Sequence, residues 1–357
     1  MGSPTVSVTY QWQCNGVDIP GATGLEYTAL LFEGALPGAE IRLIETLTMD
    51  GGSASVSSNV ITMEAPDILV LDQDYGRRQS RHDTLSHTIM DCRGGRWELS
   101  NLEEPLNRYP VFTADSQDVI IQGGEVHGNV PLDTPWQDTY VNACAVTARD
   151  THDVIIKDWV ITQVWDGIRI GGERNERFVI ENCWVHIARD DAVENERGAP
   201  GIIRDCLFDY VNMGISLSHT SFGDVSDRVV TIERVLIRHQ SYSNDRVEDG
   251  GLLHGVPFKM RRDSARIRVF DCVFAITQPD HVTPHINRLN NMWSKLLEGS
   301  GNYWLNLSDE PWPENYPLPP TDSFTILQGQ AARDVWEARK AAWLAERGYA
   351  PRPFPPA

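Results

Sequence analysis

Short, similar segments recur along the chain from about residue 118, and this repetition constrains the fold more than any other feature. Each segment is a short strand rich in β-branched residues, a turn-like break and a second short strand: DVIIQGGEV, DVIIKDWVI, FVIENCWV, IIRDCLF, VTIERVLI and IRVFDCVF. The segments follow one another at intervals of about 23 to 38 residues, and repeats of this length indicate stacked architectures. Their side chains alternate with period two, which argues against a helical repeat.

A second block follows each of these segments, and coils of this length suit a right-handed parallel β-helix. Aligning the blocks predicts two inward stacks: Trp159, Cys183, Cys206, Val235 and Cys272, and Cys144, Ile168, Val193, Ile215 and Val256. Equivalent residues on neighbouring parallel strands lie about 4.8 Å apart, so they become direct contacts. Three of the six cysteines are thereby explained as packing residues, and the absence of a CxxC pair argues against a zinc site or a disulfide framework.

The rung pattern resembles the pectate-lyase-like right-handed β-helix superfamily over residues 90–305. This superfamily includes polysaccharide lyases, glycoside hydrolases, epimerases, and phage tailspikes or particle spikes that bind surface glycans. The resemblance implies a mostly β fold, a glycan ligand and, by analogy with β-helix spikes, a homo-oligomer that is a trimer. A shared fold does not select one activity among these.

The first 66 residues follow a different pattern, with short strands, an Asn15-Gly16 turn and a second turn at Asp50-Gly51-Gly52. The stretch YQWQCNGVDIPGATGLEYT followed by GAEIRLIETLTMDGGSASVSSN resembles the immunoglobulin-like domains of bacterial surface proteins and phage structural proteins. The resemblance implies that Trp12 is the buried core tryptophan and that the domain docks on other particle proteins. Few residues precede Trp12, so the sandwich is short or a neighbouring chain completes it.

The C-terminal residues 311–357 form a third region, which begins within the proline-rich stretch DEPWPENYPLPPTDS. A helix is expected over QAARDVWEARKAAWLAERGY, with Gly348 as its stop. Its apolar face is predicted to contain Val335, Ala338, Ala342 and Ala345, flanked by Trp336 and Trp343. Capping of an open β-helix end is the favoured role, ahead of a subunit contact. The predicted domains are therefore 1–66, 67–310 and 311–357.

The charge of the chain limits its partners. A formal net charge of −19, from 50 acidic and 31 basic residues, argues against binding of duplex nucleic acid or of an anionic membrane surface. No apolar run is long enough for a membrane span, and the first residues lack the features of a secretory signal. We therefore expect a component of a virion or phage-like particle, made in the cytoplasm, with a secreted or cell-surface protein as the alternative.

The second blocks predict an outward face rich in titratable groups. Its predicted columns are Asn142, Asp166, Asp191, Met213 and His254; Ala145, Arg169, Glu194, Ser216 and Pro257; and Thr147, Gly171, Glu196, Ser218 and Lys259. Carboxylates one strand apart raise each other's pKa or recruit a cation. The candidate metal ligands are Asp166, Asp190, Asp191 and Glu196, with Ca²⁺ as the cation, or no cofactor. A purely structural role is the alternative, in which aspartates cap turns and Arg169 and Glu194 form an ordinary cross-strand ion pair.

Two functions remain open on this face. The first is a non-catalytic glycan-binding spike or fibre that recognises cell-surface polysaccharide, with Trp165, Arg169, Arg197, His219 and His254 as binding residues. The second is an enzyme of the same fold. By resemblance to the lyases, Lys259 or Arg261 would remove the C5 proton of a uronate while a cation neutralises its carboxylate. Glycoside hydrolysis would use a carboxylate pair such as Asp191 with Glu194. The expectation leans towards binding rather than catalysis.

Overall fold

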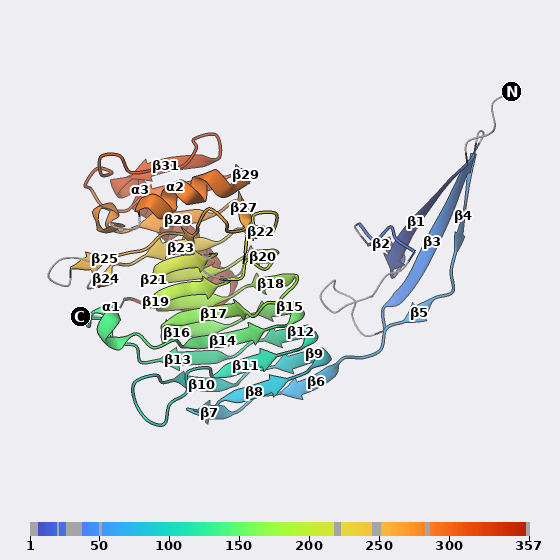
Figure 1. Cartoon of the computed structure of the whole chain (residues 1–357), viewed down its shortest axis with the longest axis horizontal. Helices are drawn as coiled ribbons and strands as arrows, with labels where there is room; N and C mark the ends of the chain where they lie inside the picture. Colours follow the sequence, from blue (N-terminus) through green and yellow to red (C-terminus); the bar gives the residue numbers. More distant parts are fainter. Residues whose placement is uncertain are drawn as a thin grey trace.

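The computed structural model describes residues 6–19, 21–25, 38–49, 52–217, 223–244, 251–282 and 286–354. The fold is mostly β, with two large parallel sheets and a C-terminal helix (Figure 1). The nine-stranded sheet contains β6 (Asp67–Val70), β9 (Ser86–Asp91), β12 (Gln117–Gln122), β15 (His152–Lys157), β18 (Phe178–Glu181), β20 (Gly201–Arg204), β22 (Val229–Glu233), β27 (Arg266–Phe270) and β29 (Leu296–Ser300).

The fifteen-stranded sheet contains two rows of parallel strands. The first row is β7 (Asp74–Gly76), β10 (Arg96–Leu99), β13 (Glu125–Gly128), β16 (Val160–Val164), β19 (Trp184–Glu194), β21 (Leu207–Ser216), β23 (Leu236–His239), β28 (Val273–Ile276), β30 (Asn302–Asn306) and β31 (Phe324–Gln328). The second row is β8 (Ser80–Asp83), β11 (Val111–Ala114), β14 (Cys144–Arg149), β17 (Asp166–Gly171) and β26 (Phe258–Lys259). The long strands β19 and β21 belong to both rows, because β19 pairs with β16 through its first half and with β17 through its second.

One turn residue in each repeat explains why the segments look alike. In five of the six segments a residue with left-handed φ, between 52° and 62°, stands immediately before the inward-facing residue: Asp158, Asn182, Asp205, Arg234 and Asp271. The first segment has Gly123 and Gly124 at its break, with φ of 74° and 103°. Aspartate and asparagine tolerate this conformation better than most residues. The break between the two short strands of each segment is therefore a turn that carries the chain from the nine-stranded sheet to the first row of the other sheet.

The core lies between the rows of strands, as the inward stacks predicted. Trp159, Cys183, Cys206, Val235 and Cys272 are all completely buried, and so are the five residues of the second predicted stack. The cysteines are free thiols rather than disulfides. Burial raises the pKa of the Cys272 thiol to about 12, which makes it unreactive as a nucleophile.

The residues before the stack form one antiparallel sheet, in the order β2 (Val17–Asp18), β1 (Ser7–Cys14), β3 (Glu40–Met49) and β4 (Gly52–Ser57), with β5 (Ile61–Thr62) on β3. Asn15 and Gly16 form the predicted hairpin turn, with φ of 50° and 81°. Within the described residues this is a single sheet, not two facing sheets, and Trp12 is half-buried instead of buried. The turn expected at residues 50–52 lies partly outside the described residues.

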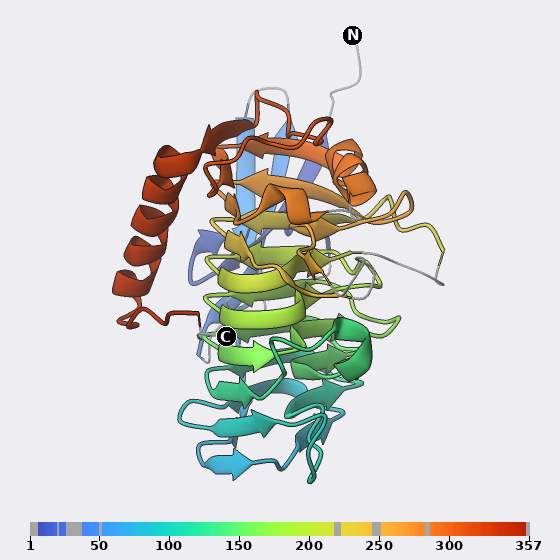
Figure 2. The same cartoon turned by 90° about the vertical axis from the view of Figure 1, so that its left-hand side faces the viewer.

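The C-terminal helix α3 (Gly329–Glu346) confirms the predicted helix, with Gly348 at φ 69° just beyond its end. Figure 2 shows α3 running along the side of the stack and not across its end. Its buried side chains pack on the outer face of the first row, against residues such as Leu207 and Leu236. Trp343 also donates from Nε1 to the carbonyl oxygen of Asp205 at 2.9 Å.

The apolar face of α3 differs from the predicted one. Ala338, Ala342 and Ala345 are exposed, whereas the buried residues are Gly329, Ala332, Trp336, Lys340, Trp343 and Leu344. Lys340 is buried because its Nζ lies 2.6 Å from Oδ2 of the fully buried Asp209. The large tryptophans outweigh the small alanines in deciding which side of the helix faces the sheet, because they bury far more apolar area.

The remaining short elements stand outside the rows. They are α1 (Trp136–Thr139), the hairpin of β24 (Tyr242–Ser243) and β25 (Leu252–Leu253), the 3₁₀ turn η3 (Pro279–Val282) and α2 (Ile286–Lys295). Of these, α1 and α2 each supply a side chain to a hollow beside the candidate site, Trp136 and Arg288.

Candidate functional site

An outward column of side chains crosses the second row of strands, with one residue from each strand. In order of neighbouring strands it contains Arg81, Phe112, Thr147, Arg169, Glu194, Ser216 and Lys259. The predicted column had Ala145 beside Arg169 and Pro257 beside Ser216, and both were wrong by two residues. A shift of two keeps every side chain on the same face of the strand, so the predicted face is right although the neighbours are not.

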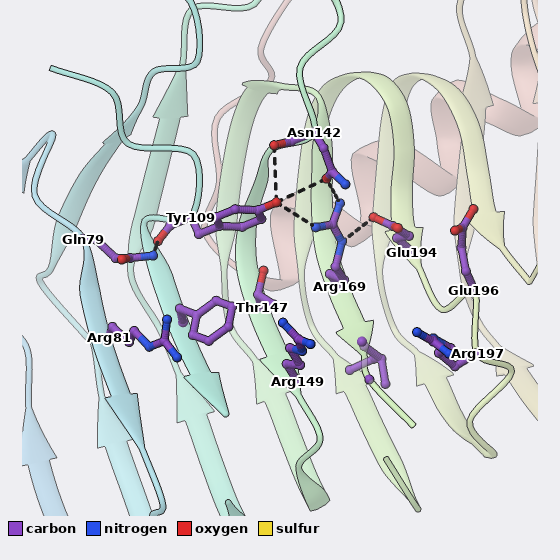
Figure 3. A pocket seen from close by; sticks show the side chains of 14 residues that line it. Gln79, Arg81, Tyr109, Asn142, Thr147, Arg149, Arg169, Glu194, Glu196 and Arg197 are labelled. Atoms are coloured by element: carbon purple, nitrogen blue, oxygen red, sulfur yellow. Dashed lines mark hydrogen bonds and ion pairs between the residues drawn. The ribbon is translucent and has the colours of Figure 1, made fainter. Parts of the chain in front are cut away.

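A groove of about 550 Å³ lies on this face (Figure 3). Four arginines line it, together with two glutamates and the aromatic residues Tyr109 and Phe112; the arginines are Arg81, Arg149, Arg169 and Arg197. Arg81 and Arg149 are more than half exposed, with side-chain exposures of 55% and 63%. Four guanidinium groups therefore line one groove of a strongly acidic chain, and each of them also lies beside a carboxylate: Arg81 beside Asp83, Arg149 beside Asp150, Arg169 beside Asp166 and Glu194, and Arg197 beside Glu173.

Arg169 is the central and best-anchored residue of the groove. Its Nη2 donates to Asp166 Oδ2 at 2.9 Å and also to Asn142 Oδ1, and its Nε donates to Glu194 Oε2. Its guanidinium also lies over the ring of Tyr109, 5.6 Å from the ring centroid. Figure 3 shows the contacts of Arg169 with Asn142, Tyr109 and Glu194. Together with the contact to Asp166 they hold the Arg169 side chain in one orientation, and it is only 13% exposed.

Three carboxylates gather behind the groove. One oxygen each from Asp166, Asp190 and Asp191 lies within 4.8 Å of the other two. Asp166 and Asp191 are each 2% exposed, and the backbone N–H of Asp191 donates to Asp166 Oδ1 at 3.2 Å. Asp191 Oδ1 is buried without a hydrogen-bond partner. Such an atom points to a ligand or a proton at this position, because a buried carboxylate oxygen without a partner is costly.

Burial raises the pKa of these carboxyl groups. For Asp166 the pKa lies well above its ordinary value because of burial and then because of the nearby charge of Glu194, although Arg169 opposes both. Burial raises the pKa of Asp191 to about 7 against the opposing charge of Lys259. Burial raises the pKa of Glu194 as well. Burial therefore favours the protonated form of these three carboxyl groups, while Arg169 and Lys259 favour the charged form.

Lys259 is bound within the same cluster. Its Nζ lies 3.0 Å from Asp191 Oδ2 and 3.5 Å from Glu196 Oε1. Burial lowers the pKa of Lys259, but the charges of Asp191, Asp190 and Glu196 outweigh burial and raise it above the ordinary value. A general base needs a lowered pKa, so this environment is unsuited to the proton abstraction expected of Lys259.

The other predicted residues are placed in different surroundings. Arg197 and Glu196 line the groove, where Arg197 lies 3.4 Å from Glu173. Glu196, predicted as a metal ligand, is 37% exposed and outside the three-carboxylate group. Arg261, predicted as an alternative base, lines a separate surface hollow with Asp224 and Asp263. His219 lies outside the described residues.

Two predicted binding residues are buried in the core. Trp165 is completely buried and is packed edge-on against Trp136 and Tyr140, so its ring cannot stack on a sugar. His254 is 1% exposed and lies against the ring of His239, and burial lowers its pKa to about 4. Both predictions followed from outward columns, which cannot show that a neighbouring loop or hairpin covers the side chain.

Several groove residues were missed from the sequence, namely Arg81, Tyr109, Phe112 and Arg149. Three of them come from residues 67–117, where the spacing of the repeat is hard to recognise. The short stretch VFTA, residues 111–114, is a local signal that this part of the chain continues the second row.

Comparison with known proteins found no relatives. The chain matches no family model, no curated protein and no solved structure. No helix among the described residues is both long and apolar enough to cross a membrane. The function therefore has to be inferred from the geometry and chemistry of the groove itself.

Proposed function

We propose that the chain is a right-handed parallel β-helix that binds an acidic polysaccharide in the arginine-lined groove. The observation that carries the proposal is the set of four arginines, which line one groove of a chain with a net charge of −19. Guanidinium groups bind carboxylates and sulfates with paired hydrogen bonds. The groove crosses neighbouring parallel strands, so its arginines follow one another along it. The acidic groups of a polysaccharide follow one another along the sugar chain in the same way.

The aromatic residues of the groove support a sugar ligand. Tyr109 and Phe112 come from the same segment, and Arg81 lies 4.7 Å from the centroid of the Phe112 ring. Aromatic faces pack on the apolar C–H faces of sugar rings while their polar neighbours accept or donate hydrogen bonds. Asn142, Gln79 and Thr147 supply such groups around the groove. Charge, rings and amides together fit an anionic polysaccharide better than a small neutral metabolite.

The surroundings of the candidate catalytic groups favour binding over cleavage. Lys259 is held by Asp191 and Glu196, Glu194 is held by Arg169, and Asp191 is almost completely buried. A lyase or glycoside hydrolase needs a base or a carboxylate pair that reaches the substrate. We therefore propose a non-catalytic spike or fibre of a phage or phage-like particle. Its N-terminal sheet, set apart from the stack in Figure 1, would be a docking module of a homotrimer.

A divalent cation fits the acidic cluster as a structural cofactor, and Ca²⁺ prefers oxygen ligands of this kind. Asp191 Oδ1 is buried without a hydrogen-bond partner, and one Asp190 carboxylate oxygen lies within 4.8 Å of carboxylate oxygens of Asp166 and Asp191. Asp190 and Asp191 would therefore hold the ion, with Asp166 beside them. When bound, the ion would supply positive charge that the cluster otherwise lacks.

The groove is tested by filling it at Gly171. A Cβ at this position meets only Cγ and Cδ of Arg169, both at 3.5 Å, so Gly171→Phe places a ring in the groove without a backbone clash. We expect affinity for acidic polysaccharides to fall at least about tenfold, or by about 1.4 kcal/mol. Retention on immobilised acidic and neutral polysaccharides, at low and high salt, measures this effect.

The matched control is Gly52→Phe in β4, where a Cβ has open space around it. This variant should bind as the native chain does, and binding should weaken with salt because it depends on charge. An assay for newly formed reducing ends should show no cleavage. Binding by Gly171→Phe as tight as that of the native chain, or a preference of the native chain for neutral polysaccharides, would contradict the proposal.

The pH dependence of stability tests the acidic cluster. The folded pKa of Asp191, about 7, is raised above its ordinary value of 3.8. The folded state therefore binds this proton more tightly, and the contribution of Asp191 to stability falls as the pH rises from about 4 to about 7. Addition of Ca²⁺ above this range should raise the Tm, because the ion binds the charged carboxylates of the folded state.

Asp191→Asn is the comparison for this measurement. The variant should lose the Ca²⁺-dependent rise in Tm and should show less destabilisation between about pH 4 and pH 7 than the native chain. The buried His239 and His254 have lowered pKa values and act in the opposite direction, and they are the same in both proteins. A Tm that is unaffected by Ca²⁺ in the native chain would exclude the cation.

A further inference from the structure

A second, smaller hollow of about 200 Å³ lies beside the acidic cluster and shares no lining residue with the groove. Its lining residues come from α1, α2, β19, β21, β26 and the segments near them: Trp136, Tyr140, Asp190, Asn212, Met213, Asn244, Lys259 and Arg288. Pockets for drug-sized ligands have volumes of about 300–1,000 Å³. This hollow is therefore of a size for one ring-sized molecule and not for an extended chain.

One wall of the hollow is aromatic. Trp136 and Tyr140 stack on each other with ring centroids 4.1 Å apart and an angle of 16° between the rings. Both meet the buried Trp165 edge-on, with centroid distances of 6.3 and 5.4 Å. Three aromatic rings in contact form a stiff surface, and such surfaces bind the apolar face of a sugar ring.

Arg189 supports the aromatic wall of the hollow. Its guanidinium is buried and donates to the carbonyl oxygens of Pro131, of Thr134 at 2.9 Å and of Ser243 at 3.3 Å. It also lies over the rings of Trp165 and Tyr242, 5.4 and 5.1 Å from their centroids. The segment that leads into α1 is therefore fixed before a ligand arrives, which reduces the entropy lost on binding.

The polar side of the hollow carries both signs of charge. Asp190 lines it, and one oxygen of its carboxylate belongs to the acidic cluster. The cations Lys259 and Arg288 also line the hollow. The ammonium group of Lys259 has three N–H donors and contacts two carboxylates, those of Asp191 and Glu196. A third donor can therefore point to a ligand. A ligand with hydroxyl groups and one carboxylate matches this combination.

We propose that the hollow is a subsite for one acidic sugar unit, a pyranose ring that carries a carboxylate. The ring packs on Trp136 and Tyr140, its hydroxyl groups donate to Asp190, and its carboxylate accepts from Lys259 and Arg288. The inference rests on the proposed function, because the ligand belongs to the same class. The hollow would bind the end or a side branch of the acidic polysaccharide. A neutral hexose lacks the group that pairs with the two cations.

The test is titration of the full chain with glucuronate, galacturonate and glucose, followed by isothermal calorimetry and by tryptophan fluorescence. Saturable binding of a uronate is expected, with affinity at least about tenfold higher than for glucose. Trp136→Ala should abolish it, and Arg288→Gln should weaken uronate binding while the Tm stays near the native value. Gly171→Phe, which fills the groove, should bind the monosaccharide as the native chain does.

The outcomes separate the subsite from the groove. If Gly171→Phe loses polysaccharide binding but no uronate binds the native chain, the subsite is wrong and the proposed function stands. If a uronate binds through Trp136 but no acidic polysaccharide is retained, the groove is wrong and the hollow remains a sugar site. Equal affinity for glucose and for uronates, or native affinity in both Trp136→Ala and Arg288→Gln, would overturn the subsite.

Discussion

Replacement of Arg169 by methionine is expected to lower the free energy of unfolding by about 3–5 kcal/mol, because removal of one partner from a buried ion pair leaves the other partner charged and unpaired. Arg169 contacts Asp166 and Glu194, and the three side chains are 13%, 2% and 16% exposed. Urea denaturation near pH 8, well above the ordinary pKa of a carboxyl group, measures the effect. The loss should be smaller near pH 5, because burial raises the pKa of both carboxyl groups and allows them to take up protons.

Two variants make this measurement specific. Arg149→Met removes a guanidinium of the same groove that is 63% exposed, and it should change stability by no more than about 0.5 kcal/mol. The double variant Arg169→Met with Glu194→Gln should recover part of the loss, since one unpaired carboxylate is removed. Equal stability of Arg169→Met and Arg149→Met would show that the Arg169 contacts do not hold the site together.

Truncation of Trp336 to alanine is expected to cost about 3–5 kcal/mol, as for other fully buried tryptophans. Trp336 is 1% exposed and belongs to the buried contact between α3 and the first row of strands. Arg238 also lies over its ring, 5.4 Å from the centroid. Thermal and urea unfolding both measure the loss, and α3 should become sensitive to limited proteolysis.

Ala338→Ser is the matched control on the same helix, because Ala338 is exposed although the sequence placed it on the apolar face. It should change stability by only a few tenths of a kcal/mol, which is the difference in helix propensity between the two residues. A change below about 1 kcal/mol in Trp336→Ala would contradict the packing of α3 on its own chain. In that case α3 would be better interpreted as a contact between subunits.

The inward side of the stack could be predicted from the sequence because it depends only on local pattern. Period-two alternation and the turn residue before each inward position were sufficient to place Trp159, Cys183, Cys206 and Cys272 in the core. The helix at the C-terminus and its glycine stop were predicted for the same reason. Its contact face was not, because alanine spacing does not reveal which surface the helix will meet.

The outward face could be predicted only in part. Arg169 and Glu194 were correctly placed as neighbours, because the strands that carry them are separated by one repeat with a clear register. Lys259 was placed two residues away from its position beside Ser216, because the alternation repeats every two residues and the long segment before β26 hides the register. Burial of Trp165 and His254 depends on segments outside the rows, which the repeat pattern does not describe.

The sequence by itself determined the repeating strands, the inward stacks and the concentration of titratable residues on one outward face, because these follow from alternation and turn chemistry within each coil. Only the tertiary structure decided which of those residues act together. It brought Arg81 and Arg149 beside Arg169, kept Lys259 on the acidic cluster and built the aromatic wall of Trp136 and Tyr140. These contacts join residues from different coils, and the register between coils is set by packing across the whole stack, not by any single segment.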